Sequence, residues 1–140
     1  MSRAPERSRR WLAWLPVLVV MGAIFALSAQ PGLRVSDDVA VDQPFRITGH
    51  LLAYATLAAL ALVALSWGRR PRLRDAAIAF GISLVYALSD ELHQSFVPDR
   101  AGRLDDVVVD ALGALVGLVV GWLALALAAL RRERRAGGAP

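Results

Sequence analysis

Four long apolar runs constrain this chain more than any other feature of its sequence. They cover residues 11–29, 47–67, 76–97 and 107–130. A helix needs about 20 residues to cross roughly 30 Å of hydrocarbon, and each run is close to that length. A chain of 140 residues that is 56% hydrophobic cannot hide this much apolar surface in water, because a small domain has little interior. We therefore predict an all-α membrane protein with four transmembrane helices. Its single domain covers residues 11–130, between basic tails at 1–10 and 131–140.

The arginines predict how these helices are oriented. All 16 basic residues are arginine, and twelve of them lie in the two tails or near the connection after the second run. The other two connections hold only Arg34, Arg46, Arg100 and Arg103. Because positive charge favours the cytoplasmic side, we expect both termini and the second connection to be cytoplasmic. A cleaved signal peptide is the alternative for the first run, since Ala-Leu-Ser-Ala at 26–29 is similar to a cleavage site.

Composition argues against several classes of function. The net charge of +4 comes without a basic face or stripe, so we do not expect nucleic-acid binding. A chain without cysteine has no disulfide, thiolate metal site or cysteine nucleophile. We also expect no cofactor and no metal, because no metal-ligand spacing such as His-x3-His is present. Suitable donor atoms are nevertheless carried by His50, Asp90, Glu91, His93, Asp106 and Asp110.

The third run cannot cross a membrane without carrying charges into it. Its uncharged part, residues 76–89, covers only about 21 Å at about 1.5 Å per residue. Asp90 and Glu91 would therefore enter the outer membrane region, where an ionised group in lipid costs up to about 3 kcal/mol. We expect both side chains to face the protein interior or a wet cavity.

Polar residues on the other runs lie at the same level and share helix faces. A spacing of four residues aligns His50 with Tyr54 on the second run and Asp90 with Gln94 on the third. The fourth run carries one stripe of acidic and small residues, Asp106, Asp110, Gly113, Gly117 and Gly121. Small residues let helices pack closely. Close packing along the glycines with carboxylates above them predicts a polar pocket that opens outward.

A specific motif joins the third and fourth runs. Residues 86–117 read Tyr-x3-Asp-Glu-x2-Gln-x-Phe-x-Pro-x-Arg-x5-Asp-x3-Asp-x2-Gly-x3-Gly, and His-x3-Tyr stands at 50–54. Together they resemble the VanZ-like family of small bacterial membrane proteins over roughly residues 45–121. The resemblance implies a multi-pass fold in the bacterial plasma membrane. It also implies a role at the cell envelope, because the founding member lowers susceptibility to the glycopeptide teicoplanin. It implies no particular reaction, so whether the protein is an enzyme stays open.

Two positions depart from the family pattern. Members often carry a lysine just before the histidine, where this chain has Arg-Ile-Thr-Gly at 46–49. Asp110 occupies a position that is usually asparagine. The first departure argues against a required lysine, and the second adds a negative charge to the site.

The predicted site is the polar cluster at the outer helix ends. We expect any catalysis to come from Glu91, Asp90 and Asp106. We expect ligand binding by His50, Tyr54, Gln94, Arg100 and Asp110. The resemblance implies seven of these eight positions, all except Asp110.

Carboxylate pairs and their structural alternative give the cluster two interpretations. Glu91 with Asp90, or Asp106 with Asp110, would form a pair of nearby acids. In such a pair the pKa of one acid is raised and that of the other stays low, which suits general acid–base catalysis. In the structural alternative, Arg100 and Arg103 neutralise the acids, with a salt bridge from Arg100 to Asp106. For His50, the structural alternative is a hydrogen bond between helices.

Three functions follow from these features. The favoured one is binding or modification of a lipid-linked or cell-wall-related headgroup at the outer leaflet, with membrane lipid or an envelope precursor as partner and Arg100 gripping its anion. The second is a non-enzymatic scaffold or partner-binding module, in which Gly113, Gly117 and Gly121 bind a second copy. The third is a proton-coupled transporter, since acids inside a membrane often mark proton routes. Against it, the acids lie only in the outer half.

Overall fold

The computed structural model describes residues 10–67, 69–100 and 102–137, and all its regular elements are helices. A short 3-10 helix, η1 (Arg10–Trp14), leads into α2 (Leu15–Ser28). The longer helices are α3 (Val39–Leu65), α4 (Leu73–Gln94) and α5 (Leu104–Gly137). Each of the four predicted apolar runs is therefore helical. Arg3, Arg7 and Arg9 of the predicted amino-terminal tail lie outside the described residues.

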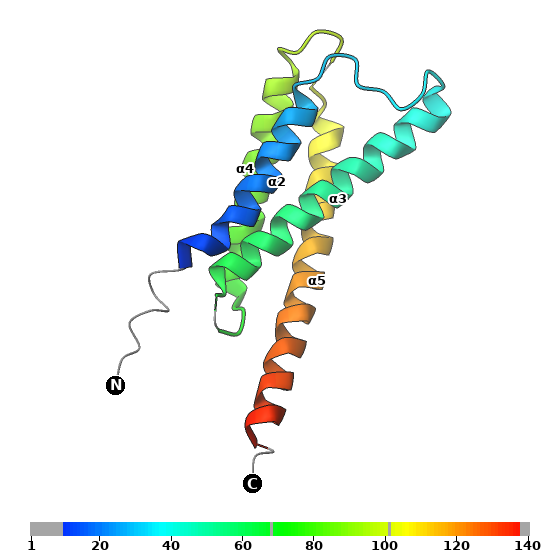
Figure 1. Cartoon of the computed structure of the whole chain (residues 1–140). Helices are drawn as coiled ribbons and strands as arrows, with labels where there is room; N and C mark the ends of the chain where they lie inside the picture. The colour runs from blue at the N-terminus through cyan, green and yellow to red at the C-terminus, as the bar shows by residue number, and fades with distance from the viewer. Residues whose placement is uncertain (1–9, 68, 101, 138–140) are drawn as a thin grey trace.

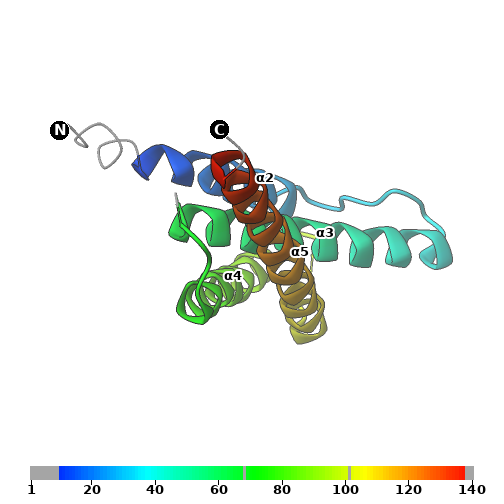
Figure 2. The ribbon, with the colours of Figure 1, turned by 90° about the horizontal axis from the view of Figure 1, so that it is seen from below.

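The helices form a bundle that α3 crosses diagonally (Figure 1). α3 contacts α2, α4 and α5, and its contact with α5 is the most extensive in the chain. Its amino end projects beyond the other helices, and residues 29–38 reach across from the end of α2 to meet it (Figures 1 and 2). The start of η1 and the end of α5 lie at the opposite, lower end of the bundle (Figure 1).

The outer surface of the bundle is apolar. Three described segments, residues 10–28, α3 and α5, are long and apolar enough to cross a membrane. Only 17% to 33% of the residues in their apolar windows are buried, so most of these side chains point outward. Val19, Val119 and Leu123 are all more than half exposed. Because helices satisfy their own backbone hydrogen bonds, such a surface suits lipid. The protein is an all-helical membrane protein.

The helix α4 differs from the other long helices. It has 22 residues, enough length for a span, but it does not meet the apolar criterion that the other three segments meet. Its acidic residues Asp75, Asp90 and Glu91 are all buried inside the protein. Packing against the other helices thus removes these charges from the outer surface, as the sequence predicted for Asp90 and Glu91.

The glycine stripe of α5 is the contact surface for α3. A methyl group on Gly113 would overlap the carbonyl oxygen of Leu51, and one on Gly117 would overlap that of Ala55. The predicted close packing along this stripe is confirmed, and its partner is α3 of the same chain. Binding of a second copy through Gly113, Gly117 and Gly121 stays a prediction, and it would require α3 to leave the stripe.

Two helices extend beyond their predicted ends. α3 begins at Val39 rather than at residue 47, because the Asp38 side chain caps it by accepting a hydrogen bond from the backbone N–H of Ala40 at 2.9 Å. α5 continues to Gly137 rather than ending at residue 130. Arginine and glutamate are good helix formers, and arginine near a carboxyl end complements the helix dipole. The extension of α3 places Arg46 on the same helix as His50.

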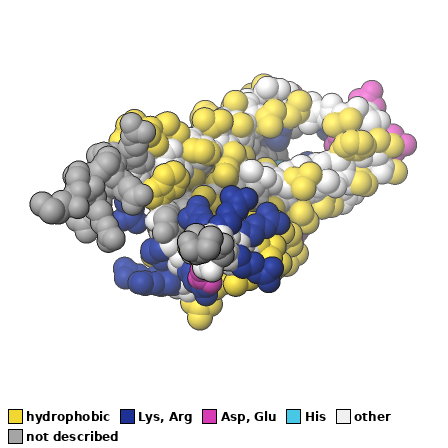
Figure 3. All heavy atoms as spheres, turned by 60° about the horizontal axis from the view of Figure 1, so that its bottom comes forward, with side chains coloured by type: hydrophobic (Ala, Val, Ile, Leu, Met, Phe, Trp, Pro, Cys, Tyr) yellow, Lys and Arg dark blue, Asp and Glu magenta, His cyan; other side chains and the backbone are white. Residues whose placement is uncertain are grey.

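The lower end of the bundle carries many of the described arginines, and basic side chains gather around the end of α5 (Figure 3). Two of them form ion pairs with acidic residues of α4 and α5. Arg69 grips Asp75 at the start of α4 through two hydrogen bonds of 2.6 and 2.7 Å, and Arg70 pairs with Glu133 of α5. The Arg69 guanidinium and the backbone N–H of Arg72 lower the pKa of Asp75 to about 2. These arginines therefore stabilise tertiary structure in addition to their predicted role in orientation.

Candidate functional site

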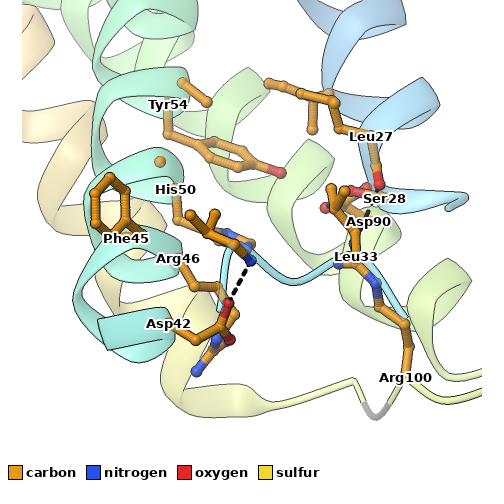
Figure 4. A pocket seen from close by; sticks show the side chains of 14 residues that line it. Leu27, Ser28, Leu33, Asp42, Phe45, Arg46, His50, Tyr54, Asp90 and Arg100 are labelled. Atoms are coloured by element: carbon orange, nitrogen blue, oxygen red, sulfur yellow. Dashed lines mark hydrogen bonds between the residues drawn. The ribbon is translucent and has the colours of Figure 1, made fainter. Parts of the chain in front are cut away.

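A pocket of about 240 Å³ lies between α2, α3 and the connection 29–38 (Figure 4). Its apolar lining consists of Ile24, Leu27, Leu33, Val35 and Phe45, with Phe45 of α3 and Leu27 of α2 on opposite sides (Figure 4). The polar lining consists of Ser28, Asp42, Arg46, His50, Tyr54, Asp90 and Arg100. A concave site with apolar lining and a few convergent polar groups is the usual form of a ligand pocket. Its shape and lining suit an amphipathic ligand.

Asp90 lines this pocket and joins α4 to the end of α2. Its Oδ2 atom accepts hydrogen bonds from the Ser28 hydroxyl at 2.8 Å and from the Gln94 amide at 3.0 Å. The Tyr54 ring extends across the pocket from α3 toward Ser28 and Asp90 (Figure 4). The Tyr54 hydroxyl is buried and has no hydrogen-bond partner among the described residues.

Arg100 follows α4 and reaches back to the end of α2. Its guanidinium donates to the carbonyl oxygens of Leu27 and Gln30, each at 3.2 Å, and to the Gln94 side chain at 3.4 Å. It forms no ion pair with a carboxylate among the described residues. The structural alternative for Arg100, a salt bridge to Asp106, is not found among the described residues, because Arg100 donates to backbone carbonyls at the end of α2. These long, neutral contacts leave the Arg100 charge without a compensating anion.

The partner of Asp106 is Arg46, which sequence reasoning missed. The two side chains form an ion pair between α3 and α5, with Asp106 almost fully buried and Arg46 about 30% exposed. The structural alternative also expected Arg103 to neutralise the buried acids. Its guanidinium instead contacts the exposed Asp105. A signal for Arg46 was present, since it precedes His50 by four residues and so shares its helix face.

His50, Asp110 and Glu91 converge from three helices beside the pocket. The Nδ1 atom of His50 lies 2.9 Å from Oδ1 of Asp110, so the predicted helix-to-helix hydrogen bond of His50 is confirmed. Glu91 accepts a hydrogen bond from the backbone N–H of Arg103 at 2.6 Å. One donor atom from each of His50, Glu91 and Asp110 lies within 4.8 Å of the others.

The carboxylates are paired differently from the sequence prediction. Neighbouring residues on a helix point about 100° apart, since one turn takes about 3.6 residues, so Asp90 and Glu91 diverge. Asp90 contacts Ser28, while Glu91 lies near Asp110 on α5. Asp106 and Asp110 share a face of α5, but each has its own basic partner on α3. The acid pair of Glu91 and Asp110, with carboxylate oxygens within 4.8 Å of each other, therefore crosses from α4 to α5.

A second hollow adjoins the pocket and is lined by arginines. It shares Leu33, Asp42, Arg46 and Arg100 with the first pocket. Its other lining residues are Gly32, Arg34, Gln94, Asp99, Arg103 and Asp106. Four arginines and three aspartates thus line this second hollow. Between them, the two hollows and the adjoining cluster contain all eight residues that the sequence named as the candidate site.

Comparison with known proteins places this site in a family. A family model described as VanZ/LLP1 matches residues 11–126, which is most of the chain and includes all four long helices in large part. Searches of curated proteins and of solved structures found no match. The matched region contains the pocket, the glycine stripe and the polar cluster described above. The chain therefore belongs to the VanZ/LLP1 family of helical membrane proteins.

Proposed function

We propose that this protein binds the anionic headgroup of a membrane lipid or lipid-linked envelope precursor at the outer leaflet. The observation that carries the proposal is the junction of an apolar-walled pocket with an arginine-lined hollow. An acyl or prenyl chain would lie against Leu27 and Phe45. The phosphate or carboxylate of the same molecule would meet Arg100, whose planar fork suits bidentate contacts.

The charge on Arg100 favours an anionic ligand. Its described contacts are two backbone carbonyls and one amide, so an incoming anion would find an uncompensated guanidinium. Arg46 is different, because Asp106 already neutralises it. We therefore assign the anion contact to Arg100 and treat Arg46 as a residue that positions the neighbouring carboxylates.

The topology that this proposal requires has four spans with both termini in the cytoplasm. The arginine-rich lower end supports it, because cytoplasmic connections carry an excess of arginine. The pocket then opens at the outer surface of the plasma membrane. The buried positions of Asp90 and Glu91 support α4 as the fourth span, since the bundle covers its charges.

A binding experiment tests the headgroup proposal. The full chain, purified in detergent, is titrated with short-chain phosphatidylglycerol, a short polyprenyl diphosphate and short-chain phosphatidylcholine. We expect at least one anionic ligand to bind about tenfold more tightly than phosphatidylcholine. Arg100→Gln should remove that preference. Arg132→Gln makes the same change of charge at an exposed position on α5 and should preserve the preference. Equal affinity of the wild type for all three ligands would contradict the proposal.

Single-cysteine labelling tests the topology, because the chain has no native cysteine. Asp37→Cys and Ser95→Cys should react with a membrane-impermeant maleimide in intact cells. Arg74→Cys and Ala136→Cys should react only after permeabilisation. Labelling of Ser95→Cys and Arg74→Cys from the same side would show that α4 does not span.

A cellular experiment tests the envelope role. Expression of the wild-type chain in a glycopeptide-sensitive bacterium should lower teicoplanin susceptibility, and Arg100→Gln should abolish the effect at equal protein level. Arg132→Gln serves again as the control. A phenotype that persists with Arg100→Gln would favour the scaffold alternative, in which headgroup contact is not needed.

A further inference from the structure

His50, Glu91 and Asp110 form a convergent donor set that the headgroup proposal does not use. They come from α3, α4 and α5, and one donor atom of each lies within 4.8 Å of the other two. The separation of 2.9 Å between His50 Nδ1 and Asp110 Oδ1 is near that of two neighbouring ligands, since bonds of about 2.1 Å put ligand atoms about 3.0 Å apart at a right angle and about 3.4 Å apart at the tetrahedral angle.

Two oxygen atoms in this set are buried and have no hydrogen-bond partner in the part of the chain that the structure describes. They are Oε1 of Glu91, a residue that is 5% exposed, and Oδ2 of Asp110, a residue that is 0% exposed. A buried carboxylate oxygen that lacks a hydrogen bond costs stability, and native structures rarely keep one without a reason. Both oxygens are acceptors, so a bound cation would satisfy them.

The charge balance around the set also favours a cation. Four carboxylates are buried here, on Asp90, Glu91, Asp106 and Asp110. Among the described residues, the guanidinium that pairs with one of these carboxylates is that of Arg46. With the four carboxylates ionised and His50 neutral, three negative charges remain in a region shielded from water. Such charges are strongly unfavourable unless they are paired, and one divalent cation would balance two of them.

We propose that His50, Glu91 and Asp110 bind a divalent transition-metal cation, with Zn²⁺ and Mn²⁺ as the ions that fit this donor set. Imidazole favours zinc and other transition metals, while carboxylates also suit manganese. Three protein ligands leave a coordination position open. The side chain of His50 lines the pocket and is 15% exposed, so that open position would face the pocket. If the pocket holds a headgroup, the cation would lie beside it, and this consequence alone rests on the proposed function.

Metal binding by the purified full chain tests the inference without any lipid ligand. After treatment with a chelator and its removal, the protein is titrated with Zn²⁺ and with Mn²⁺, and bound metal is counted by elemental analysis. We expect one ion per chain. Glu91→Gln and Asp110→Asn, which preserve side-chain size, should weaken binding by at least about tenfold. His93→Gln removes the other histidine, and Asp105→Asn removes an exposed acid, so both controls should bind like the wild type.

A measurement on the wild type keeps the test independent of variant folding. Bound Mn²⁺ should show nuclear coupling to an imidazole nitrogen in pulsed electron paramagnetic resonance. Absence of metal at micromolar concentrations, or loss of binding in His93→Gln instead of Glu91→Gln, would overturn the inference. Because these measurements contain no lipid, their failure would leave the headgroup proposal standing, and failure of lipid binding would leave the metal site standing.

Discussion

The imidazole Nδ1 of His50 and the carboxylate Oδ1 of Asp110 lie 2.9 Å apart across the interface of α3 and α5. Asp110 is fully buried, so this contact supplies the hydrogen bond that its carboxylate would otherwise lack on that oxygen. The same interface holds the Arg46–Asp106 ion pair one turn away. Two polar links thus hold α3 against α5 above the glycine stripe.

We expect His50→Ala, measured with a chelator present, to destabilise the protein by about 3 kcal/mol, because it leaves a buried carboxylate without its partner. Adding Asp110→Asn should restore most of that loss, since the amide is neutral. Unfolding in mixed micelles of increasing denaturing detergent measures both variants. Equal instability of the single and double variants would show that the contact contributes little.

Arg46→Gln should destabilise the bundle, because Asp106 would stay buried without a counter-charge. A loss of about 3 kcal/mol is expected for breaking such a pair from one side. The double variant Arg46→Gln with Asp106→Asn should be closer to wild type. The same unfolding assay gives the coupling energy from the four proteins in the cycle. Additive losses would mean that the two side chains do not interact.

Gly117→Ala should weaken the packing of α3 on α5, since the added methyl would overlap the carbonyl oxygen of Ala55. Overpacking of this kind costs about 1–3 kcal/mol. Gly22→Ala is the matched control, because nothing lies within 4 Å of that position and alanine favours a helix. Thermal unfolding in detergent should therefore show opposite shifts for the two variants. A neutral Gly117→Ala would place α3 farther from the stripe.

The Arg69–Asp75 contact predicts a pH dependence at the lower end of the bundle. The pKa of Asp75 in the folded protein is about 2, below its ordinary value of 3.8. The contribution of the contact to the free energy of unfolding is therefore complete above about pH 4 and is lost as pH falls toward 2. With partial exposure of Arg69, we expect about 1 kcal/mol at neutral pH. Stabilities of the wild type and Asp75→Asn should converge at low pH. A difference that stays constant between pH 7 and pH 2 would contradict this.

The helices and the level of the polar cluster could be predicted from sequence because both depend on local properties. Each apolar run is helical, and the short uncharged part of the third run correctly predicted that Asp90 and Glu91 are buried. The helix ends were less predictable. The cap at Asp38 and the helical tail beyond residue 130 use polar residues, which hydropathy alone assigns to connections.

The partners within the cluster could not be predicted, because they depend on how the helices cross. The sequence suggested acid pairs between residues near each other in the chain, whereas the structure brings Glu91 of α4 to Asp110 of α5. Arg46 meets Asp106 because α3 starts early and packs along the glycine stripe. No local pattern contains that crossing.

By itself, the sequence determined that this protein is helical, that it has an apolar surface suited to lipid, and that its acids gather near the ends of α4 and α5. These properties follow from hydropathy and helical periodicity, which act over a few turns. The tertiary structure decided which acid meets which base, where the pocket opens and which three side chains converge. Those outcomes depend on the close approach of α3 to α5, which the three glycines permit and the diagonal path of α3 directs.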